Sequence, residues 1–311
     1  MSATVTKPNL LFAGLSCLDH IWQVERFPPT ASRTHSSAYH LQGGGAAATA
    51  AVTAAKLGAN AELWALHGDD MNGRVALGEL ERANVNCSHL RTLPNAKTFV
   101  SAVLVDPAGE RHIFPYRGEN LQDSAEGWYY GRLANVDCVL TDGRHPLMNE
   151  AVLREARRLG VPTVGDWSNT RNWALTRFVD YLIVSEECAA EVLGDDDPEA
   201  ALAKLRGFDE QLVGITLGEQ GFLFEQHGKL RHVPALHVDA VDTTGAGDVF
   251  HGAYAYGVAM GYDVDYCALF ASVTAALSCT GVGRSTIPDA VEVATLLEEK
   301  TAKEIDEMQW T

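Results

Sequence analysis

An α/β fold, with helices on both faces of a mostly parallel sheet, is predicted by the way apolar runs alternate with helical segments. Each run is short, and most are followed by a turn and then by a helix-like segment. The runs occupy residues 10–15, 61–66, 136–140, 161–164, 181–184 and 212–217. Strands that alternate with helices in this way form parallel sheets that are buried on both sides.

The helices are predicted from their composition and from the glycines that end them. Residues 46–57 are rich in alanine, follow three consecutive glycines and stop at Gly58. Residues 249–260 are closed in the same way by Gly261. Further helices are predicted at 75–83 and 149–159. No linker or repeat interrupts the pattern, which predicts a single domain over residues 1–311.

Two segments show strand-like alternation without a helix, at about 20–42 and 98–116. The second contains the turn sequence DPAG at 106–109 between two alternating runs, which is typical of a β-hairpin. Both segments leave the α/β pattern and return to it. The sequence therefore predicts a small antiparallel flap, a lid, inserted at two points.

Charge and composition limit the kinds of partner. The chain has 24 Lys and Arg against 41 Asp and Glu, a formal net charge of −17. Nucleic acids and anionic membrane surfaces are bound largely by basic residues, so neither is expected as a partner. The six cysteines form no CxxC motif, and no leader-like or membrane-spanning run is seen. We expect a cytoplasmic protein with free thiols.

The strongest chemical signal is DTTGAGD at residues 242–248, directly before a predicted helix. Small residues allow close approach to a ligand, and the start of a helix offers unpaired N–H groups, so the segment can cradle an anion. Asp248 could then act as the base on an incoming hydroxyl. The alternative is a glycine-rich turn with Asp248 as an ordinary helix cap.

A second cluster, Gly43-Gly44-Gly45, precedes the alanine-rich helix and suggests backbone contact with a small polar ligand. Asp19 follows the first predicted strand, where open α/β sheets bind ligands, although a lone aspartate in a loop is usually only solvated. The histidines show no HxxxH or HExxH spacing, so no zinc site is expected.

These segments resemble a known family. GGGAAATAAVTAAKLGA at 43–59, GDDMNGR at 68–74 and DTTGAGDVFHGA at 242–253 are similar to the signature regions of the ribokinase/PfkB-type carbohydrate kinases. The resemblance extends over essentially the whole chain. It implies a three-layer αβα sandwich with a β lid, ATP and Mg²⁺ as cofactors, K⁺ in some members, and a homodimer formed through the lid.

The resemblance also implies residue roles. Asp248 matches the catalytic base, and Gly245, Ala246 and Gly247 match the backbone anion hole. The positions implied for sugar binding are Asp19, Gly44, Gly45 and Thr49. Those implied for ATP binding are Ser185, Thr216, Gly218, Gly221, Cys279, Gly281 and Gly283. Asp242 and Thr244 resemble residues near the monovalent-cation site.

Two departures from the family pattern point to the ketose-kinase branch. Thr49 stands where the family has a sugar-binding asparagine, and SEEC at 185–188 stands where an Asn-x-x-Glu motif helps to organise Mg²⁺ and phosphate. Within that branch the chain is most similar to bacterial sulfofructose kinases, with Arg33 and Arg144 at cationic positions. Two arginines directed at one site suit a substrate with a fixed anion. The alternatives are surface arginines, or one arginine that binds sugar hydroxyls.

The leading hypothesis is transfer of the ATP γ-phosphoryl group to a primary hydroxyl of a ketose, such as 6-deoxy-6-sulfofructose or another anionic ketose. Kinases of a neutral, fructose-like sugar or of a nucleoside remain alternatives, the latter with lid aromatics Trp22, Phe27 or Tyr39 as stacking groups. A Rossmann dehydrogenase is disfavoured because no GxGxxG follows the first strand. A non-catalytic sugar-binding regulator is disfavoured by the intact GAGD segment.

Overall fold

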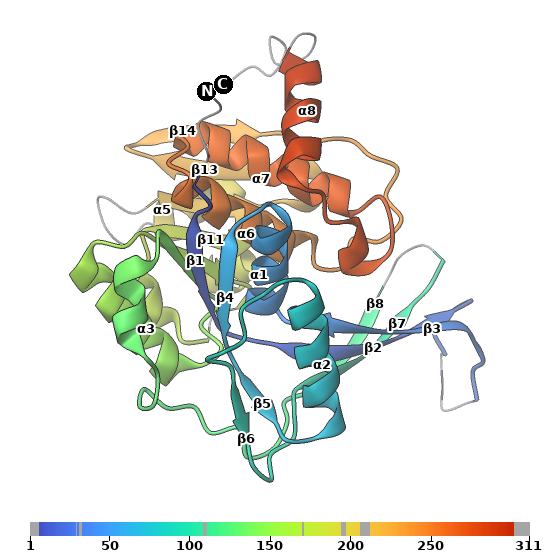
Figure 1. Ribbon diagram of the computed structural model, residues 1–311. Coiled ribbons are helices and arrows are strands. Elements are labelled where there is room, and N and C mark those ends of the chain that lie inside the picture. Colours follow the sequence, from blue (N-terminus) through green and yellow to red (C-terminus); the bar gives the residue numbers. More distant parts are fainter. Residues whose placement is uncertain are drawn as a thin grey trace.

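The computed structural model describes residues 6–28, 30, 33–107, 111–169, 171–193, 197–205 and 212–301. Its central sheet contains the predicted buried strands (Figure 1). The strands are β1 (Asn9–Ala13), β4 (Asn60–Trp64), β9 (Cys138–Thr141), β10 (Thr163–Trp167), β11 (Tyr181–Ser185), β12 (Leu212–Thr216), β13 (Phe222–Gln226) and β14 (Lys229–Val233). Their order is β14-β13-β12-β11-β10-β9-β1-β4, in which only β13 and β14 run antiparallel to their neighbours.

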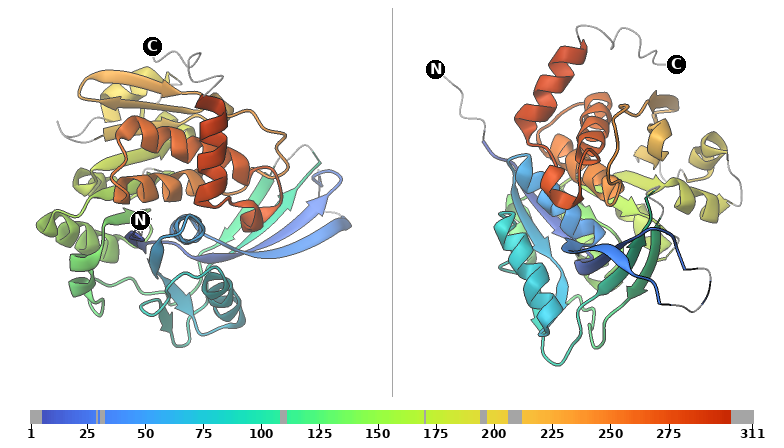
Figure 2. Two further views of the ribbon diagram at one scale, coloured as in Figure 1. Left: turned by 45° about the horizontal axis from the view of Figure 1, so that its top comes forward. Right: turned by 90° about the vertical axis from the view of Figure 1, so that its right-hand side faces the viewer.

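Alternate residues of the parallel strands pack on opposite faces, which produces the three layers. Leu10 and Phe12 of β1 face α1 (Ala46–Lys56), α6 (Ala246–Ala259), α7 (Val264–Ser278) and α8 (Ala290–Thr301). Leu11 and Ala13 face α3 (Pro146–Leu159) on the other side. On that side α4 (Glu186–Leu193) and α5 (Pro198–Leu205) cover β11 and β12. Figures 1 and 2 show the sheet between these helical layers. The predicted three-layer fold is confirmed.

A second sheet projects from the body of the molecule, at the lower right in Figure 1. It contains β2 (Cys17–Val24), β3 (Ser36–Gly44), β7 (Val100–Val105) and β8 (Arg111–Tyr116), in the order β3-β2-β7-β8. The outer pairs are antiparallel as predicted, but β2 and β7 are parallel. An entirely antiparallel flap is therefore wrong, since the two inserted segments lie side by side in the same direction. Residues 108 and 109 of the predicted hairpin turn lie outside the described residues.

Several element boundaries differ from the prediction. The run 61–66 is broken at Ala65, so β5 (Leu66–Gly68) is a separate strand that pairs with β6 (Arg91–Leu93). Helix α2 (Met71–Arg82) starts before residue 75 because the Asp70 carboxylate caps it, accepting the N–H of Gly73 at 2.9 Å. The short 3₁₀ segments are Tyr130–Asn135, Trp173–Phe178, Gly218–Gln220 and Gly283–Thr286. None of the described helices is long and apolar enough to cross a membrane.

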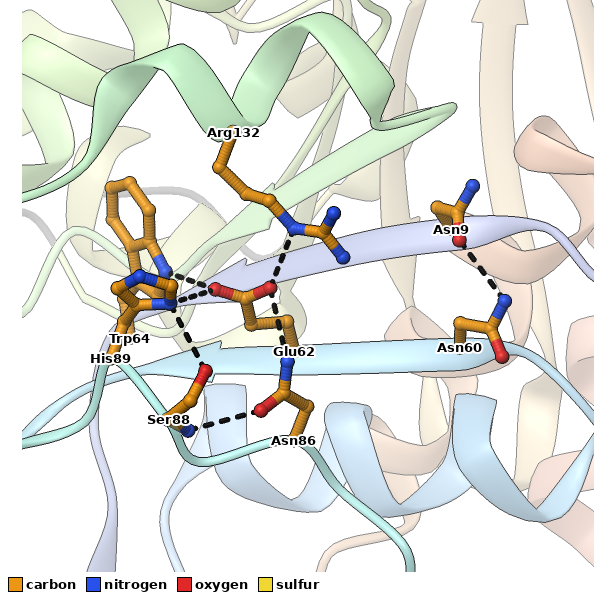
Figure 3. Close-up of polar contacts among 8 residues, drawn as sticks. All are labelled: Asn9, Asn60, Glu62, Trp64, Asn86, Ser88, His89 and Arg132. Carbon is orange, nitrogen blue, oxygen red and sulfur yellow. Dashed lines mark hydrogen bonds and ion pairs between the residues drawn. The ribbon is translucent and has the colours of Figure 1, made fainter.

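Glu62 on β4 is buried at the edge of the sheet and is fully surrounded by donors (Figure 3). Its carboxylate accepts hydrogen bonds from Trp64 Nε1 at 2.8 Å and Arg132 Nε at 2.8 Å. His89 Nδ1 lies 2.7 Å away and Asn86 Nδ2 at 3.3 Å. These contacts tie the strand to the chain on either side of it, so this carboxylate has a structural role.

Candidate active site

The DTTGAGD segment forms the entrance to α6. Gly245 caps the helix with φ 76°, a left-handed conformation that favours glycine. Asp248 therefore lies in the first helical turn and is not the helix cap. The N–H groups of Gly247 and Asp248 have no partner one turn earlier, as at every helix start. A Cβ on Gly247 would meet no atom within 4 Å, so there is open space beside these amides. The segment can hold an anion there.

Asp248 is a half-buried carboxylate whose surroundings favour the protonated form. Burial, reinforced by the negative charge of Asp166, raises the pKa of Asp248 to about 8. The positive charge of Arg284 opposes this shift. A carboxylate with a pKa near the working pH is well matched to accept a proton from an alcohol and to release it again.

A buried pair lies behind Asp248. His251 is one helical turn further along α6, and its Nδ1 is 3.5 Å from Oδ2 of Asp166 on β10. The same nitrogen is 2.6 Å from the carbonyl oxygen of Gly247. Oδ2 of Asp166 has no hydrogen-bond partner among the described residues, and burial raises the pKa of this carboxyl. Asp142, after β9, adds further negative charge to the cluster.

The predicted sugar-binding residues lie close to one another and near Asp248. Asp19 lies on β2 beside Gly44, where a Cβ would overlap its carboxylate. Burial raises the pKa of Asp19, and its hydrogen bonds with Ser101 and Cys17 oppose the shift. Gly45 caps α1 with φ 94°, and Thr49 on α1 is buried.

Thr49 connects this group to the anion loop. A Cβ on Gly245 would stand 3.6 Å from both Thr49 Cγ2 and Asp248 Oδ2. The structure therefore brings together Asp19, the glycine triplet, Thr49 and Asp248, which are far apart in the sequence.

The two arginines predicted to bind an anionic group are less closely tied to this site. Arg144 follows β9, and its Nη2 donates to Ser168 Oγ at 3.0 Å. Its charge reaches Asp166. Arg33 is exposed in the chain that leads into β3, and no polar contact joins its side chain to another described site residue. The neighbouring residues 31 and 32 lie outside the described part of the chain. Convergence of the two arginines stays a prediction.

The residues predicted to bind nucleotide lie at ends of neighbouring elements. Ser185 ends β11 and caps α4, accepting the N–H of Cys188 at 3.2 Å, and Thr216 ends β12. Gly218 and Gly221 flank a 3₁₀ turn and both have positive φ. Gly281 packs against Thr286. No contact among the described residues tests their role in ATP binding.

Asp242 joins the DTTGAGD segment to the loop that contains Gly283. Its carboxylate accepts the N–H of Thr244 at 2.8 Å and that of Gly283 at 3.1 Å. The carbonyl of Cys279 accepts the N–H of Asp242 at 3.2 Å. The described residues contain no group of three His, Cys, Asp or Glu side chains arranged to hold a metal ion. The contacts of Asp242 therefore show a structural role, in which its carboxylate joins the loop at Thr244 to the loop at Gly283. A role for Asp242 and Thr244 in cation binding stays a prediction.

Two cationic residues at the site escaped the sequence analysis. Arg111 on β8 donates from Nη1 to Thr244 Oγ1 at 3.0 Å and from Nη2 to Thr243 Oγ1 at 3.4 Å, so the second sheet touches the anion loop. Arg284 donates to Thr49 Oγ1 from two nitrogens. The GVGR segment at 281–284 was a visible signal for Arg284, whereas no spacing marks Arg111.

Comparison with known proteins identifies the family. The profile described as pfkB family carbohydrate kinase matches residues 7–290. An ATP-dependent ribose-1-phosphate kinase from Halopiger xanaduensis is 31% identical over 302 residues, which cover 94% of this chain and 99% of the relative. A ribokinase from Haemophilus influenzae is 27% identical, with 94% and 99% covered. A crystal structure from Agrobacterium tumefaciens, assigned as a ribokinase, matches with a TM-score of 0.91 at 27% identity, covering 96% of this chain and 100% of that one.

A ribokinase-like fold with a glycine-rich anion loop at a helix start defines this class of protein, and the chain belongs to the pfkB family of carbohydrate kinases. It is an ATP-dependent carbohydrate kinase. The predicted family and enzyme class are confirmed. The relatives reported above are of ribokinase type, so the ketose-kinase branch is not shown.

Proposed function

We propose that the protein transfers the γ-phosphoryl group of ATP to a primary hydroxyl of a small sugar bound beside Asp19, with Asp248 as the general base. The observation that carries the proposal is the position of Asp248. This carboxylate, with its pKa raised to about 8, lies in the same helical turn as the amides of the anion loop and faces the group that contains Asp19 and Thr49.

In this mechanism Asp248 accepts the proton of the attacking hydroxyl, and the amides of residues 245–248 stabilise negative charge on the transferring phosphoryl group. Mg²⁺ is proposed as a cofactor, supplying neutralisation of charge on the ATP phosphates when bound. Because Mg²⁺ usually takes one or two carboxylates together with phosphates and water, the lack of a three-ligand cluster in the described residues fits that mode. Glu186 and Glu187, at the start of α4, are the carboxylates of the SEEC segment.

The acceptor proposed from the sequence is an anionic ketose such as 6-deoxy-6-sulfofructose, with Arg144 and Arg33 near its anionic end. A neutral, fructose-like sugar is the alternative. The names of the relatives add ribose and ribose 1-phosphate to the acceptors that need testing. A nucleoside is supported by one observation: Trp22 and Tyr39 on the second sheet lie with ring centroids 5.3 Å apart and could stack on a base.

The second sheet is proposed to be a lid over the sugar and part of a homodimer contact. Its strands expose apolar side chains, among them Phe114 at 59% and Tyr116 at 42% exposure, which lie two residues apart and so share one face of β8. A partner's lid could bury such a face. Sedimentation at micromolar concentration should show a dimer, and a strict monomer would contradict the dimer but leave the lid in place.

The function is tested by ADP release with a panel of acceptors at matched concentration. The panel contains 6-deoxy-6-sulfofructose, fructose, ribose, ribose 1-phosphate and nucleosides, and mass spectrometry identifies the phosphorylated product. The Asp248→Asn variant is the control for chemistry at this site. Sugar-dependent ADP release that is lost in the variant supports the proposal, while ADP release independent of every acceptor contradicts it.

A further inference from the structure

Arg284 is held in a fixed position at the sugar side of the site. It lies in the 3₁₀ turn Gly283–Thr286, which the carboxylate of Asp242 and the hydroxyl of Thr286 fasten to neighbouring backbone. Its Nε and Nη2 donate to Oγ1 of Thr49 at 3.2 and 2.7 Å. Thr49 is itself fixed within α1, where its N–H donates to the carbonyl of Gly45 at 2.8 Å. The orientation of the guanidinium group is therefore fixed both by the backbone of its turn and by its hydrogen bonds to Thr49.

The remaining nitrogen, Nη1, lies over the glycine triplet. A Cβ on Gly43 would stand 2.6 Å from Nη1 and 2.9 Å from Glu79 Oε2. A Cβ on the next residue, Gly44, would overlap the carboxylate of Asp19. The two glycines thus leave room on one strand for Arg284 and Asp19. The charge of Arg284 also acts on both Asp19 and Asp248.

Several N–H groups of Arg284 have no hydrogen-bond acceptor among the described residues. A guanidinium carries five N–H groups, and Thr49 is the only hydrogen-bond acceptor that the described residues offer it. No ion pair joins Arg284 to a carboxylate within the described part of the chain. A guanidinium fixed by one neutral hydroxyl is ready to donate to a ligand oxygen.

We propose that Arg284 is an acceptor-binding residue that determines specificity: it donates from Nη1 to an oxygen of the acceptor sugar, while Asp19 accepts from a neighbouring hydroxyl. This inference rests on the proposed function. A donor-only group and an acceptor-only group beside the same strand, β3, match two adjacent hydroxyls, one accepting and one donating. Since the carboxylates of Asp19 and Glu79 already lie beside the same two glycines as Arg284, the oxygen bound by Arg284 is that of a neutral hydroxyl. Thr49 is the positioning residue.

The test is calorimetric binding of the acceptor sugar without ATP, which separates affinity from chemistry. Arg284→Ala should weaken binding about tenfold to a hundredfold, the usual range for a hydrogen bond to a charged group. Arg284→Lys should recover part of the loss, because it keeps a charged donor. Arg157→Ala, on the exposed face of α3, is the matched control and should bind as the unmodified protein does.

Two further measurements separate binding from folding and locate the bound oxygen. Thr49→Val removes the hydroxyl that holds the guanidinium, and the double variant Thr49→Val/Arg284→Ala should bind no more weakly than Arg284→Ala alone. A series of deoxy analogues locates the bound hydroxyl. For the analogue that lacks it, affinity for the Arg284→Ala variant should equal the affinity of the parent sugar for the same variant. If Arg284→Ala fails to fold, Arg284→Lys and Thr49→Val carry the test.

Each outcome is informative. Sugar affinity within twofold of the unmodified protein in Arg284→Ala, or additive losses in the double variant, would overturn the role of Arg284. A loss confined to sugars with a fixed anion would overturn the neutral-hydroxyl assignment. If the unmodified protein phosphorylates no sugar at all, the proposed function fails instead, and the panel of acceptors shows this before any variant is made.

Discussion

Glu62 and Asp166 are both buried carboxylates on the central sheet, at 3% and 6% exposure, yet the chain surrounds them differently. The carboxylate of Glu62 has polar contacts with four side chains, those of Trp64, His89, Arg132 and Asn86 (Figure 3). Oδ2 of Asp166 has no hydrogen bond among the described residues and faces His251 at 3.5 Å. Where a carboxylate only ties strands together, its lone pairs are filled. At Asp166, in the candidate active site, one oxygen lacks a hydrogen-bond donor within the described part of the chain and burial raises the pKa, so a proton binds more tightly.

The comparison is tested most directly at Asp248. Asp248→Asn should cut turnover by about two to four orders of magnitude, the usual contribution of a positioned general base. ATP binding should be nearly unchanged, because the backbone of the anion loop is kept. Steady-state kinetics and nucleotide titration measure the two effects. Near-normal turnover would remove Asp248 from the mechanism.

The opposite result is expected at Glu62. Glu62→Gln leaves Arg132 without its ionic partner and should lower the free energy of unfolding by about 2–4 kcal/mol, with little change in turnover. Glu150→Gln, in the exposed pair with Arg154, is the control and should cost less than about 1 kcal/mol. Urea unfolding measures both. A stable Glu62→Gln protein with poor turnover would reverse the roles of the two regions.

Arg144 sharpens the comparison because its positive charge faces Asp166. Arg144→Ala should raise KM for an anionic ketose such as 6-deoxy-6-sulfofructose by about tenfold, since a charge-assisted contact is lost. KM for fructose, if fructose is accepted, should change little. Equal losses on both sugars would make Arg144 a hydroxyl ligand or a structural residue, and a preference of the unmodified protein for fructose would overturn the anionic acceptor.

The smallest effect concerns pH and stability. The pKa of Asp248 is raised to about 8 in the folded protein, from about 4 when unfolded. Between these values the folded state holds the proton and the unfolded state does not, so the stabilisation is complete below about pH 4 and is lost as the pH rises to about 8. Asp248→Asn removes this loss. Its melting temperature relative to the unmodified protein should therefore rise by about 6 °C from pH 5 to pH 9, because about three pH units of linkage are lost over that range. A constant difference would show that the carboxylate titrates normally.

The sequence predicted the parts of the site that lie in short contiguous motifs. Gly245 and the glycine triplet precede helix starts, where a left-handed backbone or close approach to a ligand requires glycine. Asp248 follows Gly245 in the same motif. Asp166 and His251 could not be found in this way, because they meet only when β10 packs against α6. Arg111 reaches the anion loop only through the pairing of the second sheet.

The parallel pairing of β2 with β7 has the same origin. Each segment alternates like an ordinary hairpin strand, and the relative direction of two strands far apart in the sequence depends on where the intervening chain returns. The layers of the fold were predictable because the alternation of strands and helices repeats locally. The relative direction of β2 and β7 in the second sheet was not predictable in this way.

One consequence follows from the second sheet. It carries Asp19 on β2, which is proposed to bind the sugar, and Arg111 on β8, which contacts the loop proposed to hold the transferring phosphoryl group. A movement of this sheet as a unit would shift both contacts together. The binding of one substrate would therefore change the affinity for the other. Thermodynamic linkage then requires reciprocity: the factor by which sugar tightens ATP binding equals the factor by which ATP tightens sugar binding. The second sheet, proposed to cover the acceptor, would in this way also make the binding of each substrate depend on the presence of the other.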